Sequence, residues 1–459
     1  MPRNPVAAII GYNRRFVGRY DVLLQRKVEN LARSPFKFFR GTFHLFAQDY
    51  AERLIAAPPT PLPADGALAI VGDIHGENYG TYKAADGTLR YDINDFDETT
   101  AAQLNFDCRR AATGLVLAGR DISLAEPKIL AAVQGFAESY WDQLRANLKQ
   151  DPDKFEEISD RHPPEAAVAK TLLANAVAAK RKEVLDQILK GGADGGSFAR
   201  NGKFFDLKPA DNERARRLLA EYFARLTGPK AKELASAKTL DVAGRVAGCG
   251  SLGRYRFVVL LAVADAADKR PIVLEIKESL PSACDDRSAT HEAKAAHGKS
   301  AAKPDAGHAG LGRAGGVDRA TLRARAAEVC AVERAMQPAS NAYLGYAVDD
   351  GGSFQVRELG PHDARLEWKD VQHEHEFGDI AALHARILAN AHIRCAASDP
   401  ARRKLADATP LDGKDRRSSF VTDLMQFAQA YAGIVASDHA MFREKATEVS
   451  LALGLDAGK

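Results

Sequence analysis

The chain has 459 residues, of which 46% are hydrophobic and 27% are charged. This composition is ordinary for a globular protein and excludes an intrinsically disordered chain. The formal net charge of +3 is small for this length, so we expect neither a nucleic-acid nor a membrane partner.

The five cysteines are odd in number and widely spaced, without a CxxC pair, so they predict neither a disulfide framework nor a zinc site. The amino terminus has no continuous apolar core, and the longest apolar run, near residues 257–264, is too short to span a bilayer. We therefore expect a cytoplasmic protein with two or three lobes.

Apolar spacing predicts two helices early in the chain, over residues 20–32 and 38–54. In the second, Phe39, Phe43, Phe46 and Tyr50 recur at helical spacing, and we interpret this aromatic stripe as core. Arg40 in the same segment is a candidate substrate contact, because an arginine near the start of a helix below a phosphate site could reach the substrate. A solvated arginine is the alternative.

The stretch LAIVGDIHGENYGTYKAADGTLRYDINDFDE, residues 68–98, holds most of the polar chemistry. A short apolar strand, 68–71, ends at a polar loop. After a turn, a second strand with alternating apolar residues leads into an acidic segment. The loop and this segment supply the candidate site residues Asp73, His75, Asn78, Asp95 and Asp97.

Carboxylates at the ends of two short adjacent strands repel one another unless a cation lies between them. Magnesium is the natural candidate, because a few oxygen ligands hold it and phosphate oxygens complete its octahedron. The carboxylates of this stretch and Asn78 are therefore candidate ligands of magnesium. The alternative is an acidic, solvated hairpin.

Two classes of motif compete for these residues. GDIHG resembles the opening signature of metallophosphoesterases, but the later GDxxDRG and GNH[DE] motifs of that class do not occur in the sequence. GDxHxxN followed by DFD resembles the catalytic and metal loops of kinase-like phosphotransferases, and here both are present in that order. That resemblance implies that Asp73 and His75 are catalytic residues and that Asn78, Asp95 and Asp97 are metal ligands. It also implies that Asp107 hydrogen-bonds the backbone of the catalytic loop, with an ordinary N-cap as the alternative.

Three glycines then follow in GxGxxG spacing within residues 239–263. A Rossmann loop would open a helix, but residues 255–263 are β-branched and aromatic, so we predict two antiparallel strands instead. A third strand, 271–276, runs into a lysine. This order resembles a kinase small lobe, in which the loop covers the nucleotide phosphates and the lysine reaches them. The candidate nucleotide-binding residues are Gly248, Gly250, Ser251, Gly253 and Lys277, and the alternative is a glycine hairpin beside a surface lysine.

Residues 282–319 are rich in Ala, Gly, Lys and His without apolar periodicity, and they predict a disordered insertion. The next helix carries Glu328 and Glu333. The kinase resemblance implies that a glutamate here pairs with the strand lysine, and we choose Glu333 by its spacing. Residues 354–359 predict the last strand of the sheet, and the remainder is helical.

The motifs SPFKFFRG, GDIHGENYG, DINDFDET, VAGCGSLGRYR, LEIKES and MQPASNAYLG extend over most of the chain. Together they resemble the uncharacterised bacterial family catalogued as domain of unknown function 2252. The chain carries glutamate at position 333, where relatives tend to carry glutamine. The resemblance implies a fold and a site rather than a substrate.

The order of the motifs is permuted, because Asp73 and Asp95 precede Lys277, whereas kinases place the glycine loop and lysine first. We therefore expect an α+β, two-lobed, protein-kinase-like fold that is circularly permuted. Residues 1–235 and 361–459 are expected to build a largely helical large lobe. Residues 236–360 are expected to form a small lobe with an antiparallel sheet.

The expected function is phosphoryl transfer from ATP, with magnesium, to an unknown small-molecule or protein acceptor. Asp73 would orient or deprotonate the acceptor hydroxyl, and Lys277 would anchor the phosphates. Three alternatives stay open: nucleotidyl transfer on the same fold, a metallophosphoesterase, and a non-catalytic nucleotide-binding protein.

Overall fold

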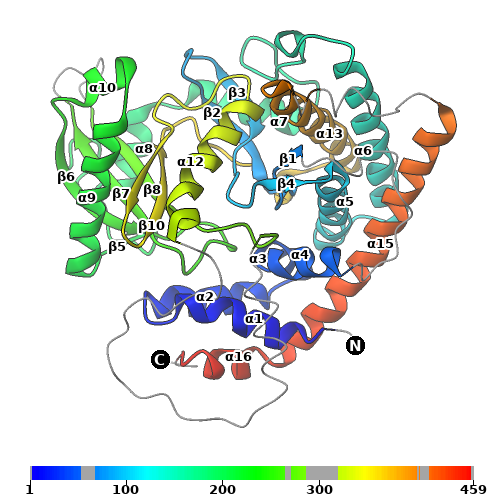
Figure 1. Cartoon of the computed structure of the whole chain (residues 1–459), viewed down its shortest axis with the longest axis horizontal. Helices are drawn as coiled ribbons and strands as arrows, with labels where there is room; N and C mark the ends of the chain where they lie inside the picture. The colour runs from blue at the N-terminus through cyan, green and yellow to red at the C-terminus, as the bar shows by residue number, and fades with distance from the viewer. Residues whose placement is uncertain are drawn as a thin grey trace.

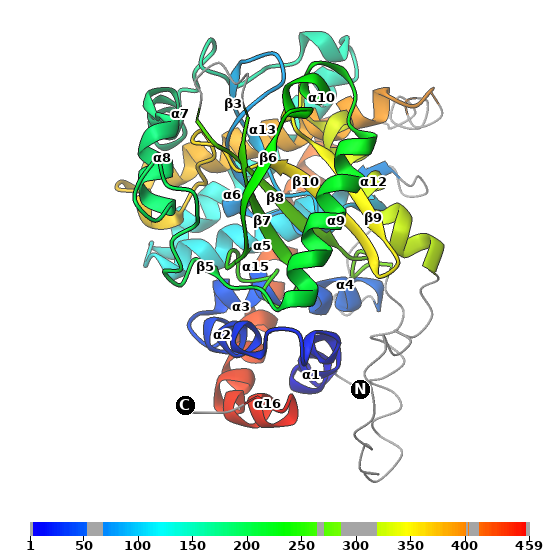
Figure 2. The same ribbon diagram turned by 90° about the vertical axis from the view of Figure 1, so that its left-hand side faces the viewer.

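The computed structural model describes residues 3–52, 68–263, 270–285, 319–400, 403 and 413–455. A twisted sheet with its own helices lies at one side of the molecule, and a bundle of long helices lies at the other (Figure 1). Helices from the two ends of the chain form a layer below both (Figures 1 and 2). The chain is thus a mixed α+β protein, as predicted.

The large sheet has six strands in the order β5-β6-β7-β8-β10-β9, and every neighbouring pair is antiparallel. This confirms the predicted antiparallel sheet and is incompatible with a parallel Rossmann sheet after the glycine segment. The strands are β5 (Phe204–Phe205), β6 (Lys238–Arg245), β7 (Arg256–Ala262), β8 (Ile272–Ser279), β9 (Gly345–Asp349) and β10 (Gly352–Glu358).

Both faces of this sheet are covered, which explains why β7 is apolar at nearly every position. On the outer face, Phe257 and Val259 pack with α9 (Pro209–Arg225). On the inner face, Val258 packs with residues of α8 (Arg181–Ile188) and its following turn. Two further helices complete this part: α10 (Gly228–Leu234) and α12 (Arg319–Met336), which packs on β9 and β10. The short helix η3 (Pro152–Lys154) instead contacts α13 (Glu374–Ala397) of the helical part.

Helices α8 to α10 precede residue 236 and yet pack with the sheet. The boundary at 235/236 therefore does not separate the two parts of the structure. Helical periodicity identified these helices but carried no information on which core they join.

The helical part is built from both ends of the sequence. Phe46 of α4 makes edge-to-face contacts with Phe427 and Tyr431, and Phe38 of α3 packs on Phe442. These residues belong to one continuous core. The helices of the helical part are α3 (Pro35–Gly41), α4 (Phe43–Ala51), α5 (Leu104–Asp121), α6 (Glu126–Asn147), α7 (Ala167–Ala178), α13 (Glu374–Ala397) and α15 (Lys414–Glu444).

The lower layer consists of α1 (Pro5–Asn13), η1 (Arg14–Phe16), α2 (Asp21–Leu31) and α16 (Ala446–Ala452) (Figure 2). Asn4 caps α1 by accepting hydrogen bonds from Val6 and Ala7, and Pro5 fits the first turn because it needs no amide donor there. The single helix predicted over 38–54 is in fact two, α3 and α4, which are broken at Thr42.

Residues 68–102, called the central stretch below, form two small sheets. β1 (Leu68–Ile70) pairs with β4 (Thr100–Ala102), and β2 (Tyr79–Lys83) pairs with β3 (Leu89–Ile93). The two strands expected to lie side by side, β1 and β3, therefore have different partners. The acidic segment still meets the loop after β1, because η2 (Gly76–Asn78) leads directly into the hairpin.

Most of the predicted insertion, residues 286–318, lies outside the described residues. Its first residues are packed: Ser282 is buried and donates a hydrogen bond to the carbonyl oxygen of Glu98 (2.9 Å). Residues 282–285 therefore belong to the folded part. Among the helices that the structure describes, none is long and apolar enough to cross a bilayer.

Candidate active site

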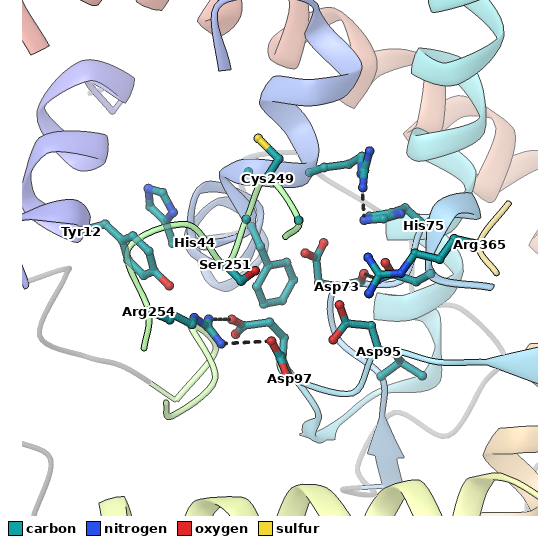
Figure 3. A pocket seen from close by; sticks show the side chains of 18 residues that line it. Tyr12, His44, Asp73, His75, Asp95, Asp97, Cys249, Ser251, Arg254 and Arg365 are labelled. Carbon is teal, nitrogen blue, oxygen red and sulfur yellow. Dashed lines mark hydrogen bonds and ion pairs between the residues drawn. The ribbon is translucent and has the colours of Figure 1, made fainter. Parts of the chain in front are cut away.

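A cavity of about 60 Å³ lies where the central stretch, the glycine loop and the N-terminal helices meet (Figure 3). The central stretch contributes residues 71–78 and 95–98, and the loop after β6 contributes residues 248–251. The rest of the wall comes from other parts of the chain: Tyr12, Arg40, Gly41, Phe43, His44, Arg254 and Arg365. The cavity thus brings together the two motif regions that the sequence places about 150 residues apart.

Asp73 lies near the start of the loop that follows β1. Gly72 before it has a φ of +85°, and a Cβ at that position would lie 2.3 Å from the carbonyl oxygen of Glu98, so only glycine fits. The carboxylate of Asp73 accepts hydrogen bonds from Nε (3.0 Å) and Nη2 (2.5 Å) of Arg110, a fully buried residue of α5. Burial raises the pKa of Asp73 to about 7, and the ion pair with Arg110 opposes that rise.

His75 and Arg40 form a second polar group on the wall. Nε of Arg40 donates to Nε2 of His75 (3.3 Å), and its Nη1 forms an ion pair with Glu77. Arg40 is therefore held inside the site rather than solvated. Burial and the neighbouring arginines keep the pKa of His75 well below its usual value, so the ring is neutral. Because Nε2 accepts, the ring proton is on Nδ1, which is buried and has no hydrogen-bond partner among the described residues.

Asp95 and Asp97 converge on one cation. Nζ of Lys277 lies 3.2 Å from Oδ1 of Asp95 and 2.5 Å from Oδ2 of Asp97. Although burial alone would raise the pKa of Asp95, the charges of Lys277 and Arg365 hold it below its usual value. Asn78 uses its side-chain nitrogen to donate to the carbonyl oxygen of Asp73 (2.6 Å).

These residues fit a magnesium ion. The carboxylates of Asp95 and Asp97 contact the same ammonium group, so they point at a common position, as ligands of a shared cation do. The amide oxygen of Asn78 is a further ligand type for magnesium. The described part of the chain holds no group of three or more His, Cys, Asp or Glu arranged to bind a metal. Magnesium suits such a sparse set, because it is commonly bound by one or two carboxylates together with substrate phosphates.

The glycine loop, residues 246–255, connects β6 and β7, and residues of the N-terminal helices pack against it. Gly253 has a φ of +101°, and a Cβ there would lie 2.9 Å from Cβ of Phe16, so both conformation and space require glycine. Nζ of Lys27 donates to the carbonyl oxygen of Gly250 (3.1 Å). Ser251 donates to the carbonyl oxygen of Ala247 (2.9 Å). The N-terminal helices therefore hold the loop against the cavity.

Asp107 supports the loop backbone. It is fully buried and accepts hydrogen bonds from the amides of Val71 (2.7 Å) and Gly72 (2.9 Å). Nε2 of His392 lies 3.0 Å from the same carboxylate. The N-cap position of α5 is Gln103, so Asp107 sits inside the first turn and faces the strand end.

Glu333 is not brought to Lys277. Its carboxylate accepts a hydrogen bond from Nε2 of Gln355 on β10 (2.6 Å), and burial raises its pKa to about 7. Glu328, the other candidate, lies beside Arg325 (3.8 Å). The pairing chosen from spacing is therefore corrected: in this structure the partners of Lys277 are the two aspartates.

Three arginines of the site were missed by sequence reasoning. Arg254 pairs with Asp97 (3.3 Å) and Glu98 (2.6 Å), Arg110 pairs with Asp73, and Arg365 projects toward Asp95 (Figure 3). For Arg110 a signal existed, because a charged residue inside the apolar run of α5 had to be paired. No local pattern marks Arg365, which lies in a connecting segment.

A family model described as "Uncharacterized protein conserved in bacteria", domain of unknown function 2252, matches residues 19–303 and 313–445. The chain belongs to this family. No curated protein and no solved structure was found to match it. Membership in the 2252 family confirms the relationship inferred from the motifs.

The buried Lys27 predicts a pH dependence of stability. Burial lowers its pKa to about 7, with Arg254 and Arg15 acting in the same direction and Cys249 and Glu98 opposing them. Above pH 7 the folded state has lost a proton that the unfolded chain keeps to about 10.5. The free energy of unfolding should therefore rise by about 1.4 kcal/mol per pH unit from this residue between pH 7 and 9.

Urea unfolding at pH 7, 8 and 9 measures this contribution. The Lys27→Met variant should lack it, so that the wild type gains stability relative to the variant as the pH increases. Parallel pH curves for the two proteins would show that Lys27 keeps its proton in the folded state.

Proposed function

We propose that the chain is an ATP- and magnesium-dependent phosphotransferase with a circularly permuted, two-lobed, kinase-like fold. One observation carries the proposal: Lys277 near the end of β8 contacts Asp95 and Asp97, which follow β3, and the glycine loop lies beside the same cavity. A strand lysine, a glycine loop and a metal-binding aspartate around one phosphate site are the parts that kinase-type phosphoryl transfer uses.

The core supports the permuted reading. In conventional kinases the glycine loop and lysine come first in the chain. Here Asp73 and Asp95 precede them, and one core joins α3 and α4 with α13 and α15. Permutation leaves such contacts intact, because it changes only the connections between packed elements.

In the proposed mechanism, Asp73 accepts the proton of the acceptor hydroxyl. The freed oxygen then bonds to the γ-phosphorus, and the bond to the bridging oxygen breaks, so that ADP leaves with that electron pair. Arg110 keeps the Asp73 carboxylate oriented. The neutral His75 keeps its Nδ1–H buried, and its Nε2 accepts a hydrogen bond from Arg40, so in this mechanism His75 positions Arg40 on the wall of the site.

Lys277 holds the phosphates in this mechanism, together with the backbone amides of the glycine loop. Asn78, Asp95 and Asp97 would hold magnesium, which supplies positive charge to the phosphate oxygens. Lys277 now neutralises both aspartates. A bound cation would replace it there and free its ammonium group for the phosphate chain.

The rival functions make different demands on the site. Nucleotidyl transfer uses the same residues with the α-phosphorus as the reacting atom, so it remains the second candidate. A metallophosphoesterase needs a ligand-rich two-metal centre, which the described residues do not provide. A non-catalytic nucleotide-binding module has no use for a half-buried Asp73 carboxylate that is held by the fully buried Arg110.

ATP labelled at the γ- or the α-phosphate tests the proposal, with the wild-type protein and magnesium. We expect γ-label to appear in inorganic phosphate, in the protein or in an added acceptor, and α-label to remain in ADP. Transfer of α-label with release of pyrophosphate would establish nucleotidyl transfer instead. Unchanged ATP in the presence of a cell extract as the acceptor source would contradict catalysis.

A further inference from the structure

The inner face of the sheet beside Lys277 is charged. In the sheet register, Lys277 lies opposite Arg256 of β7 and Gln355 of β10. Residues two apart on a strand share a face, so Glu275 lies next to Lys277 on this face, and it is opposite Arg357. A ligand that extends along the sheet from Lys277 therefore meets charged side chains first.

These side chains form a closed ion cluster around Glu275, which is only 1% exposed. Its carboxylate lies 2.9 Å from Nε of Arg256 and 3.6 Å from Nε of Arg357, and it forms a further ion pair with Arg245. One carboxylate with three guanidinium groups leaves an excess of positive charge. Opening such a buried cluster is costly, because each separated charge would lose its partner.

This cluster occupies the position where a nucleotide base needs an apolar surface. The kinase signature V-A-I-K has alanine two residues before the lysine, and this chain has Glu275 there. Base and cofactor pockets are mostly apolar. The apolar residues farther along the inner face, Val258 and Val273, already pack against Leu185 and Phe198. The described part of this face thus leaves no apolar slot for a base.

The same region is well equipped for phosphate. Nη1 of Arg256 lies beneath the glycine loop, 3.0 Å from the carbonyl oxygen of Ala247 and 3.3 Å from Oγ of Ser251. The guanidinium of Arg365 lines the cavity beside Asp95 and has no hydrogen bond or ion pair within the described residues (Figure 3). Because its guanidinium group has no such partner, Arg365 is available for an anionic ligand. Guanidinium groups bind phosphate oxygens in a bidentate manner.

We propose that the donor site selects a magnesium-bound polyphosphate chain and not a particular base. Nucleoside triphosphates of different bases and inorganic tripolyphosphate then bind with similar affinity. This inference rests on the proposed function, since it concerns the donor of the same site. Affinity comes from Lys277, Arg365 and the glycine loop, which all address phosphate oxygens.

Calorimetric titration of the wild-type protein with the magnesium complexes of ATP, GTP, UTP and tripolyphosphate tests the inference. We expect four dissociation constants within about tenfold of one another, because base contacts contribute less than about 1.4 kcal/mol. One nucleotide that binds more than tenfold tighter than tripolyphosphate would overturn the inference while leaving the proposed function standing. Binding of none of the four would remove both.

A variant separates phosphate recognition from general damage. Arg365→Met leaves no partner unpaired, and it should weaken binding of all four ligands by a common factor of about tenfold, the loss of one charge-assisted contact. Arg214→Met is the matched control: Arg214 lies on the outer-face helix α9 and pairs with Asp349 (2.6 Å), so all four affinities should stay unchanged. A loss at Arg365 that is confined to one nucleotide would contradict base-independent binding.

Discussion

Asp73→Asn is expected to lower the rate of phosphoryl transfer by about 10²–10⁴-fold, the range that a positioned general base contributes. Asparagine cannot accept the proton of the acceptor. The dissociation constant for magnesium ATP should change by less than about threefold, because the phosphates are held by Lys277 and the glycine loop. Asparagine also retains an oxygen that can accept a hydrogen bond from Arg110, so the pocket keeps its shape.

Thermal unfolding and calorimetry must accompany this rate measurement, since the substitution weakens the ion pair of the fully buried Arg110. Glu77→Gln is a suitable control. Glu77 lies on the same loop as Asp73, pairs with Arg40 of α3, and has no role in the proposed transfer. A folded Asp73→Asn protein that transfers phosphate at the wild-type rate would exclude Asp73 as the base.

Asp95→Asn is expected to damage both binding and turnover. Asp95 would hold magnesium and already faces the ammonium group of Lys277 at 3.2 Å. Even partners behind a metal ligand typically contribute about 10–100-fold, so the direct ligand should cost at least that factor in the affinity for magnesium ATP. Calorimetry at several magnesium concentrations measures the effect.

Asp86→Asn provides the comparison for Asp95→Asn. Asp86 lies in the turn of the same hairpin and pairs with Arg90 (2.7 Å), away from the cavity. Its substitution should leave magnesium ATP binding unchanged. Equal losses in the two variants would mean that the hairpin fold, rather than the metal ligand, controls affinity.

Local patterns predicted the parts of the site that depend on local structure. The β-branched run of β7 and the strand that ends near Lys277 indicated antiparallel strands around the glycine loop, and the structure has that sheet. The aromatic stripe of Phe39, Phe43, Phe46 and Tyr50 indicated core: the three phenylalanines are buried, and Tyr50 is half-buried against the same core. Periodicity is sufficient in these cases, because burial of one face determines the pattern.

Features that depend on long-range packing were not predictable in this way. Helical spacing identified the face of α12 that carries Glu333 but not its partner, because Gln355 reaches it from another strand. The pairing of β1 with β4 joins residues about 30 positions apart, across the intervening hairpin. Arg365 comes from a segment without periodicity, and only the folded chain places it beside Asp95.

A crystal structure with magnesium and a non-hydrolysable ATP analogue tests the single shared site most directly. We expect the phosphate chain to lie between the glycine loop and Lys277, with magnesium on Asp95 and Asp97 and the ammonium group of Lys277 turned from Asp97 to a phosphate oxygen. A nucleotide bound elsewhere, with Lys277 still paired to both aspartates, would contradict the proposed function.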